Sequence, residues 1–506
     1  MKRSVIEYLR RAAARLPDKT AVVDETSSMT YRELDNASSA VGSALISRTP
    51  ARMPIPVLME KSCKTLSVFL GIAKAGCFYV LMSPELPRSR LEQVQSVLNA
   101  QWVITDQAHL SLAQELFAPE QVLMIDALLS APVNEQALSA REAGHLDLDP
   151  LYANFTSGST GVPKGVVVGH RSVLDFIDVF TRTFGFGEDD VFANQAPFDF
   201  DVSVKDIYSS LAVGGTLVIV PRRLFSLPTE LLDFLCSHNV TVMVWAVSAL
   251  CLITTFHALD YKTPETVRQV LFSGEVMPMK HLREWMSHLP QTRFVNLYGP
   301  TEITCNCTYH IIDRERDYGD VIPMGGAFEN EEVLLLDGDN KLVTEQEVNG
   351  EVCVRGSALA LGYYNAWPQT NEHFVQNPLN DHFIEYIYRT GDLAHYNEQG
   401  ELVFAGRKDF QIKHMGHRIE LEEIERAIMA VPGIERACCI FDEKKSKLKG
   451  FYVGQMDKKE LHHLLSEQLP FFMVPGVLTP LEQMPLTKNG KIDRKALAAM
   501  KRGGRA

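Results

Sequence analysis

The stretch from Asn154 to Gly169 constrains this chain most, because it combines small hydroxylated residues with several glycines and a lysine. Gly158 and Gly161 allow the backbone to approach a ligand closely. Successive main-chain N–H groups, hydroxyls and the ammonium of Lys164 together favour an anion such as phosphate. The spacing differs from that of a Walker A loop, because Lys164 is flanked by a proline and a glycine. We therefore expect a phosphate-binding loop of another type; the alternative is a surface hairpin rich in glycine and serine.

Length, charge and cysteine content indicate which classes of protein this chain can belong to. At 506 residues the chain is expected to hold two or more domains. Its net charge of −13 argues against nucleic acid as a partner, and its nine cysteines include no CxxC pair, as expected for reduced thiols in the cytoplasm. The amphipathic start does not read as a signal peptide, and the longest apolar run, 240–253, is too short to span a bilayer. These features predict a cytoplasmic protein without a membrane span.

The order of helical and strand patterns along the sequence predicts an α/β fold with two domains. Helical and strand patterns alternate through most of the first 300 residues, which is typical of parallel α/β layers. From about 333 to 405 the pattern changes to short strands with tight turns, which indicates a small β-rich subdomain. We expect a large N-terminal domain of layered sheets at 1–408, including that subdomain, and a small α+β C-terminal domain at 409–506.

The C-terminal part has its own pattern of charge. Residues 411–506 carry 17 Lys and Arg against 12 Asp and Glu, so this part is net positive by 5, while residues 1–410 carry −18. Such a split is commonly a solvated surface, but it also suits docking of an acidic macromolecule. Within this part, 418–430 predicts an amphipathic helix. The glutamates expected on its solvent face are Glu422, Glu423 and Glu425.

Four further segments, together with the glycine-rich loop, point to one family of enzymes. They are Asn296-Leu-Tyr-Gly-Pro-Thr-Glu302, Tyr388-Arg-Thr-Gly-Asp392, Gly406-Arg407 and Pro485-Leu-Thr-Lys-Asn-Gly-Lys-Ile-Asp-Arg494. With the loop, they resemble the motifs of adenylate-forming enzymes, the superfamily of acyl-CoA synthetases, luciferases and peptide-synthetase adenylation domains. The resemblance spans essentially the whole chain. It implies that a carboxylic acid reacts with ATP to give an acyl-adenylate and that the acyl group then passes to a thiol, with a mobile C-terminal domain turning about the hinge Asp409.

The resemblance also implies a nucleotide site. In it the ring of Tyr298 stacks on adenine, Asp392 bonds the ribose hydroxyls, and Glu302 binds Mg²⁺ together with phosphate oxygens of ATP. Lys491 reaches the reacting phosphate and stabilises its charge without forming a covalent bond. The implied catalytic residues are Lys491, Thr156 and Lys164. The implied nucleotide-binding residues are Thr156, Ser157, Gly158, Ser159, Thr160, Gly161, Lys164, Asn296, Tyr298, Gly299, Thr301, Glu302, Asp392 and Arg407.

The segment 194–208 matches the place where amino-acid-activating relatives hold a pocket aspartate. The match makes Asp201 the counter-ion of a substrate ammonium, with Asp199 or Asp206 as the alternatives; a fatty or aryl acid would leave that carboxylate unpaired. The other implied pocket residues are Val202, Lys205, Trp245, Leu271, Ser273, Leu297, Cys305 and Asn306, with Lys491 on the substrate carboxylate. The set suits a small amino acid. Lys205 either pairs with an acidic substrate or is neutralised by Asp199 or Asp206.

At the level of subfamilies, the chain looks much like D-alanine:carrier-protein ligases and stand-alone adenylation enzymes of peptide synthesis. Nothing after Arg494 resembles a carrier domain, so we expect the thiol in trans. The predicted function is activation of an amino acid and its transfer to the phosphopantetheine thiol of a separate carrier protein. The alternative is an acyl- or aryl-CoA ligase, which would use coenzyme A as the acceptor.

Overall fold

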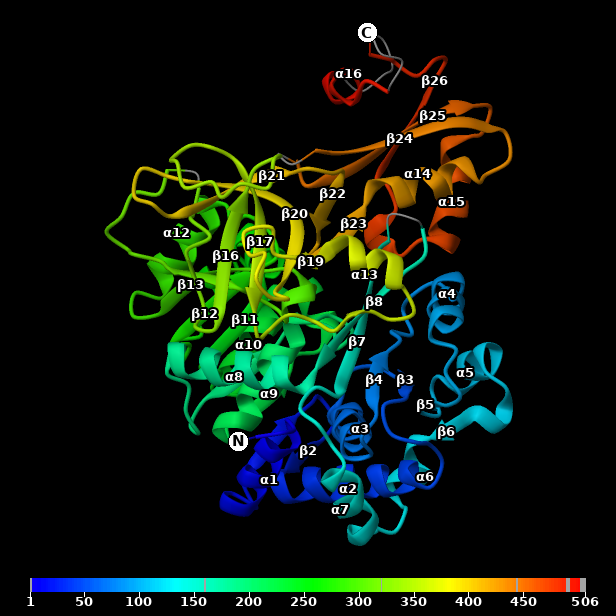
Figure 1. The fold of residues 1–506 in the computed structure, drawn as a ribbon, viewed down its shortest axis with the longest axis vertical. Helices are drawn as coiled ribbons and strands as arrows, with labels where there is room; N and C mark the ends of the chain where they lie inside the picture. Colours follow the sequence, from blue (N-terminus) through cyan, green and yellow to red (C-terminus); the bar gives the residue numbers. More distant parts are fainter. Residues whose placement is uncertain (1, 159–160, 320, 443–444, 488–491, 501–506) are drawn as a thin grey trace. The chain divides into compact units, whose positions relative to one another are not determined.

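The computed structural model describes the chain except for residues 1, 159–160, 320, 443–444, 488–491 and 501–506. The chain forms two compact units (Figure 1). The first unit comprises residues 1–83, 100–154 and 165–408, and the second comprises 84–99, 155–164 and 409–506. Helices and mixed sheets make up both units, and the predicted α/β fold class is confirmed.

A nine-stranded sheet in the first unit carries most of the candidate site. Its six inner strands run parallel, and antiparallel strands close both edges. Parallel strands covered on both faces need nearly continuous apolar runs, and β11 and β12 are buried at every residue. In sheet order the strands are β15 (Gly326–Ala327), β14 (Thr308–Ile311), β13 (Arg293–Tyr298), β12 (Gln269–Ser273), β11 (Val242–Ala246), β9 (Val191–Asn194), β10 (Thr216–Ile219), β1 (Thr20–Val23) and β2 (Ser28–Thr30).

A second sheet of seven strands is built mainly from the first 170 residues. Its inner strands β3 and β4 are parallel, which the helices between them allow. In sheet order the strands are β18 (Gly362–Tyr363), β8 (Lys164–Gly169), β7 (Pro150–Thr156), β4 (Phe78–Leu81), β3 (Pro54–Leu58), β5 (Val103–Thr105) and β6 (Val122–Met124). The predicted phosphate loop therefore connects two neighbouring strands of this sheet, β7 and β8.

Helices follow most of these strands and bury their apolar faces on the sheets. The longest, α2, begins with a reciprocal capping box between Thr30 and Glu33, which satisfies two free N–H groups at its start. The helices of the first unit are α1 (Ile6–Arg15), α2 (Tyr31–Ile46), α3 (Cys63–Lys74), α5 (Leu110–Leu116), α6 (Ile125–Leu129), α7 (Glu135–Ala143), α8 (His170–Phe184), α9 (Val202–Val213), α10 (Pro228–Ser237), α11 (Val247–Thr255), α12 (Met279–His288) and α13 (Trp367–His373).

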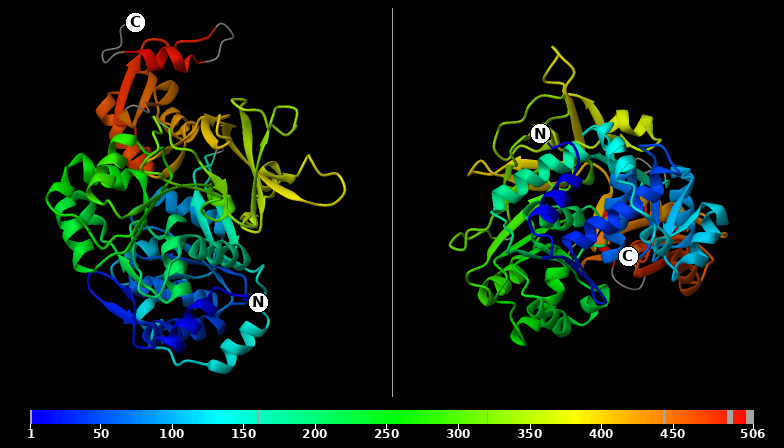
Figure 2. Two further views of the ribbon diagram at one scale, coloured as in Figure 1. Left: turned by 90° about the vertical axis from the view of Figure 1, so that its left-hand side faces the viewer. Right: turned by 90° about the horizontal axis from the view of Figure 1, so that it is seen from below.

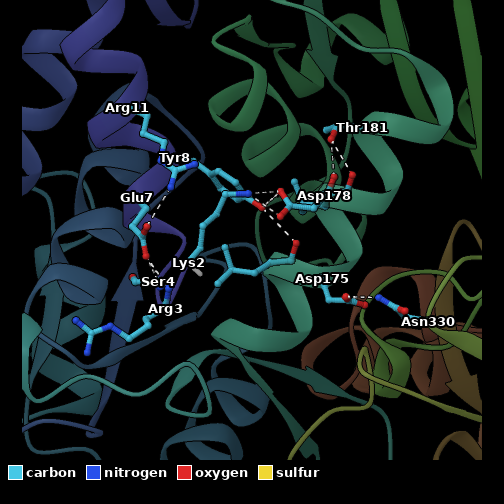
Figure 3. Close-up of polar contacts among 12 residues, drawn as sticks. Lys2, Arg3, Ser4, Glu7, Tyr8, Arg11, Asp175, Asp178, Thr181 and Asn330 are labelled. Carbon is cyan, nitrogen blue, oxygen red and sulfur yellow. Dashed lines mark hydrogen bonds and ion pairs between the residues drawn. The ribbon is translucent and has the colours of Figure 1, made fainter.

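The N-terminal helix α1 is joined to α8 by polar contacts (Figure 3). Lys2 donates to both carboxylate oxygens of Asp178 at 2.6 Å, and the hydroxyl of Tyr8 donates to the same carboxylate at 2.7 Å. Burial raises the pKa of Tyr8 far above its ordinary value, with the neighbouring carboxylate adding to the shift. The blue N-terminal helices thus lie against the cyan-green helices in both views of Figure 2. This start of the chain is part of the packed core.

The segment from about 333 to 405, predicted to be rich in β-strands, contributes to a five-stranded antiparallel sheet. Its strands are β16 (Glu331–Leu336), β17 (Gly350–Gly356), β20 (Tyr386–Tyr396), β19 (Phe374–Gln376) and β21 (Leu402–Arg407). The register of β20 against β21 sets Asp392 directly opposite Arg407. Two motifs that are 15 residues apart in the chain therefore meet on one sheet.

The second unit consists of one helix from early in the chain, the glycine-rich loop and the C-terminal part. A hairpin leads into α14, and a three-stranded sheet completes the unit. Its elements are α4 (Arg88–Leu98), β22 (Gln411–His414), β23 (His417–Glu420), α14 (Leu421–Met429), β24 (Ile434–Asp442), β25 (Lys447–Gly454), α15 (Lys458–Gln468), β26 (Val477–Leu481) and α16 (Arg494–Ala499). Across the described residues, no helix has the length and apolar character needed to cross a bilayer.

Two expectations about the segment 418–430 are wrong. Its first residues form β23, because Met415 and Gly416 adopt positive φ in a tight turn that pairs β23 with β22. Glu423 and Glu425 are buried, not exposed. Glu423 accepts a hydrogen bond from Arg90 on α4 at 2.8 Å, and Glu425 accepts one from the main-chain N–H of Cys439 at 2.7 Å. Partners from distant parts of the chain thus allow two carboxylates to lie on the inner face of α14.

Candidate functional site

The centre of the candidate nucleotide site is a buried carboxylate, Asp392. Tyr298, at the end of β13, donates its hydroxyl to one oxygen of Asp392, and Arg407 donates to the other. Asp392 is 5% exposed. Burial and the nearby carboxylate raise the pKa of Tyr298 well above its ordinary value, so this residue remains a hydrogen-bond donor. The structure therefore brings together three residues from separate motifs around an acceptor of the kind that binds sugar hydroxyls.

Gly299 allows the segment 296–302 to pack closely on the residues just before the next strand, β14. A Cβ atom at this position would lie 2.4 Å from the Cα of Asn306, far inside van der Waals contact. The main-chain N–H of Cys307 donates to the carbonyl of Tyr298 at 2.8 Å and holds the two segments together. The side chain of Asn296 on β13 is held in place, because its amide nitrogen donates to the carbonyl of Pro323 at 2.9 Å.

Glu302 supplies a buried carboxylate at the start of a short helix, η4 (Thr301–Ile303). It is 1% exposed and accepts a hydrogen bond from the hydroxyl of Tyr363 at 2.8 Å. Tyr363 lies in the small strand β18 and belongs to no recognisable motif, so its place beside Glu302 could not be predicted from the sequence. Among the residues that the structure describes, no group of three His, Cys, Asp or Glu could hold a metal. A single carboxylate fits Mg²⁺ that is otherwise bound by phosphate and water oxygens.

The described residues of the glycine-rich loop belong to the second unit and contact its helices and hairpin. Ser157 donates its hydroxyl to the carbonyl of Arg418 at 2.8 Å, and Arg426 donates to the carbonyl of Gly158 at 3.3 Å. Arg90 donates to the carbonyl of Thr156 at 3.4 Å. Gly161 adopts a φ of 85°, which favours glycine.

Other predicted residues are placed as follows. Lys164 begins β8, and Asp409 begins the long C-terminal segment of the second unit, where its carboxylate accepts from the N–H of Gln411 at 3.1 Å. Ser159, Thr160 and Lys491 lie outside the described residues.

Five predicted pocket residues come together at the start of α9. Asp201 occupies the position before the helix and is 6% exposed, and Lys205 lies one turn later and is 1% exposed. The Lys205 ammonium donates to the side-chain oxygen of Asn306 at 2.6 Å and to the hydroxyl of Ser273 at 3.4 Å. The thiol of Cys305 donates to the carbonyl of Asp201 at 3.2 Å. Charged and polar groups thus converge at the carboxyl ends of β12 and β13.

Trp245 is not on the same face of the sheet as the other pocket residues. Val244 pairs with Leu271, and Trp245 pairs with Phe272. Because side chains alternate along a strand, Leu271, Ser273 and Leu297 share one face with Val244, while Trp245 points to the other. There Trp245 is fully buried in a separate apolar cluster, and its indole N–H donates to the carbonyl of Ala193 at 2.8 Å. The side chain at this point of the predicted pocket is therefore that of Val244.

The charges near Lys205 bear on the two interpretations of that residue. The Lys205 charge lowers the pKa of the Asp206 carboxyl, but burial dominates and raises it to about 8. Asp206 accepts a hydrogen bond from Asn194 at 3.0 Å. Burial also raises the pKa of Asp199, to about 6, and the lysine that opposes this shift is Lys61. Asp206 therefore interacts electrostatically with Lys205.

Comparison with protein families identifies the chain. Residues 9–364 match the model of the AMP-binding enzyme family, and residues 423–491 match that of the AMP-binding enzyme C-terminal domain. Bacitracin synthase 1 of Bacillus licheniformis is 32% identical over 97% of this chain, and tyrocidine synthase 1 of Brevibacillus parabrevis is 30% identical over 98%. The chain spans only 9% of the first relative and 45% of the second.

Solved structures agree with this assignment. IdnL1 is 28% identical with a TM-score of 0.82, and the match covers 96% of this chain and 99% of that one. PA1221, which contains adenylation and PCP domains, is 25% identical with a TM-score of 0.81, covering 98% of this chain and 84% of that one. The Vibrio cholerae adenylation domain AlmE, at 22% identity and a TM-score of 0.85, has the same fold; the match covers 98% of this chain and 97% of that one. The chain belongs to the AMP-binding enzyme family, the adenylate-forming ligases.

Proposed function

We propose that this enzyme activates an amino acid as its aminoacyl-adenylate and transfers the aminoacyl group to the phosphopantetheine thiol of a separate carrier protein. The observation that carries the proposal is the burial of Asp201, whose main-chain carbonyl accepts from Cys305 and whose negative charge acts on that thiol. A carboxylate in such a place is favourable when a substrate ammonium pairs with it. An adenylation domain of the same fold, AlmE, was solved with glycyl-adenosine-5'-phosphate, and PA1221 joins an adenylation domain to a PCP domain.

In the first half-reaction a carboxylate oxygen of the amino acid attacks the α-phosphorus of ATP, and the bond to pyrophosphate breaks. Asp392, with Arg407 and Tyr298 bonded to it, orients the ribose and so fixes the α-phosphate. Glu302 would hold Mg²⁺, which supplies positive charge at the phosphates when bound. Lys491 would add a second positive charge at the reacting phosphate, where preorganised charge stabilises the transition state.

In the second half-reaction the thiol sulfur attacks the carbonyl carbon of the adenylate, and AMP leaves. We propose that the C-terminal part from residue 409 to 506 turns about Asp409 between the two steps. The two compact units divide between Lys408 and Asp409 in this region, which supports a pivot there.

Lys205 either pairs with an acidic substrate side chain or is neutralised within the pocket. Its ammonium already has the side-chain oxygens of Ser273 and Asn306 within hydrogen-bonding distance, and its charge acts on the buried Asp206. We propose that Lys205 belongs to the polar lining of the pocket, and exchange with aspartate and glutamate tests whether it also pairs with an acidic substrate.

The test is ATP–pyrophosphate exchange with a panel of single acids. The panel contains the twenty L-amino acids, D-alanine, D-aspartate, D-glutamate, a fatty acid and benzoate. We expect exchange with one or a few amino acids and none with the last two. Loading is then compared on phosphopantetheinylated carrier protein and on free coenzyme A. Exchange with benzoate or the fatty acid alone, followed by transfer to coenzyme A, would establish the CoA-ligase alternative instead.

A further inference from the structure

We propose that Lys61 is a positioning residue for the amino-acid pocket: its ammonium fixes the turn after β9 and, through Asn194, the placement of α9. The inference rests on the proposed activation of an amino acid. Lys61 lies between β3 and α3, just before Ser62, the N-cap residue of α3. It belongs to none of the segments that suggested the function.

The Lys61 ammonium is surrounded by four oxygen atoms of one turn. It donates to the main-chain carbonyls of Asn194, Gln195 and Ala196 at 3.2, 2.9 and 3.4 Å, and to the side-chain oxygen of Asn194 at 3.2 Å. Carbonyl dipoles that converge on one point repel each other unless a cation lies between them. Because β3 belongs to the seven-stranded sheet and β9 to the nine-stranded sheet, this cation joins the carboxyl ends of strands from two different sheets of the first unit.

The side chain of Asn194 connects Lys61 to α9 by two hydrogen bonds. It is fully buried, and its side-chain oxygen faces Lys61, so its amide nitrogen points to the opposite side. There it donates to the carboxylate of Asp206 at 3.0 Å, one residue beyond Lys205 on α9. A change at Lys61 would therefore release both the amide of Asn194 and the helix that carries Lys205.

The same turn also supports the other wall of the pocket. The side-chain oxygen of Gln195 accepts from the main-chain N–H of Ala246 at 3.2 Å, at the end of β11. This bond lies two residues beyond Val244, whose side chain shares a face with Leu271. One cation therefore holds the turn that is bonded to both α9 and β11.

The environment of Lys61 makes its charge sensitive to pH. Burial lowers its pKa to about 7. Asp206 from α9 and Asp199 from the preceding turn oppose this shift, and Arg222 from η2 (Arg222–Ser226) adds to it. Below pH 7 the ammonium is charged and holds the turn. As the pH rises through 7 the charge and one N–H donor are lost, so binding of the amino acid should weaken.

The experiment compares Lys61→Met, Lys61→Arg and the control Lys64→Met in pyrophosphate exchange with the best amino acid of the panel. Lys64 lies on α3 with half of its side chain exposed and pairs with Asp126, so its loss should change nothing. We expect Lys61→Met to raise KM for the amino acid by about 10- to 100-fold, the scale for losing a charged hydrogen bond. KM for ATP should change by less than about threefold, because Tyr298, Asp392 and Arg407 are bonded to one another on other strands of the first unit.

The pH profile separates positioning from mere stability. In the wild type, KM for the amino acid should begin to rise near pH 7. In Lys61→Arg the ionisation near pH 7 should disappear, so that only that of Asp206 near pH 8 is left, while KM at pH 6 stays close to that of the wild type. Equal rises in both KM values, or no change in Lys61→Met, would overturn the proposal. If Lys61→Met does not fold, a wild-type profile that is flat from pH 6 to 8.5 would overturn it as well. A wild type that exchanges with no amino acid refutes the proposed function instead.

Discussion

The ion pair between Arg90 and Glu423 provides a sharp test of how the second unit is held together. The two side chains are 9% and 8% exposed, and the guanidinium nitrogen lies 2.8 Å from the carboxylate oxygen. Burial raises the pKa of Glu423 although Arg90 opposes the shift, which shows how strongly the surroundings disfavour its charge. Removing Arg90 alone would leave that carboxylate buried without its ion-pair partner, with only the charge of Arg426 and the main-chain N–H of Gly158 still favouring its ionised form.

The expected size of the effect follows from this burial. Breaking a buried pair by removing one partner costs about 3–5 kcal/mol, whereas an exposed pair contributes about 0–1 kcal/mol. Arg90→Met and Glu423→Gln should each destabilise the second unit by about 3 kcal/mol or more. The double variant Arg90→Met/Glu423→Leu should lose much less than the sum, because apolar groups that replace both charges avoid the desolvation of an unpaired ion.

The matched control lies on the same helix. Arg88 and Glu92 form an ion pair one turn apart, with 57% and 52% of their side chains exposed. Arg88→Met should therefore cost less than about 1 kcal/mol. The assay is urea unfolding, together with hydrogen exchange of peptides from α4 and α14. Losses of similar size for Arg88→Met and Arg90→Met, or strictly additive losses in the double variant, would refute the reasoning.

Three further predictions concern the site and the partner. Asp201→Asn should abolish pyrophosphate exchange with amino acids while binding of ATP alone, measured by calorimetry, stays within about threefold; normal exchange would show that another group pairs with the ammonium. Val244→Met should change which amino acid is preferred in the panel, whereas Trp245→Phe should lower the midpoint of thermal unfolding and leave the preference unchanged. For loading of an acidic carrier, kcat/KM should fall when the salt concentration rises from about 0.05 to about 0.5 M, because salt screens long-range attraction between charged surfaces. It should also fall when the charges of the exposed Lys445 and Lys447 are reversed, while pyrophosphate exchange remains nearly constant in both cases. If loading is as insensitive to salt as exchange, the positive charge of residues 411–506 does not attract the carrier and is only a solvated surface.

The local chemistry of the site could be predicted from short segments. A run of glycines and hydroxyls followed by a lysine predicts a phosphate loop from the sequence alone, because the backbone freedom and the N–H groups are local properties. The alternation of helical and strand patterns likewise predicted parallel layers. Asp392 and Arg407 could be named separately, and the antiparallel register of β20 and β21 then brought them together.

The residues that the sequence misplaced are those whose role depends on a distant partner or on strand register. Trp245 and Val244 are neighbours in the chain, yet a shift of one residue along a strand exchanges the two faces of the sheet. Glu423 and Glu425 read as solvent-facing because glutamates seldom lie buried without a partner, and their partners come from α4 and from β24. Lys61 belongs to no motif, and the four oxygens that surround its ammonium come from a turn more than 130 residues away. The sequence by itself thus determined which chemical groups are available and where helices and strands alternate, since both depend mainly on neighbours in the chain. Only the tertiary structure decided which face each side chain occupies and which buried charges are compensated, because those depend on contacts between residues far apart in the chain.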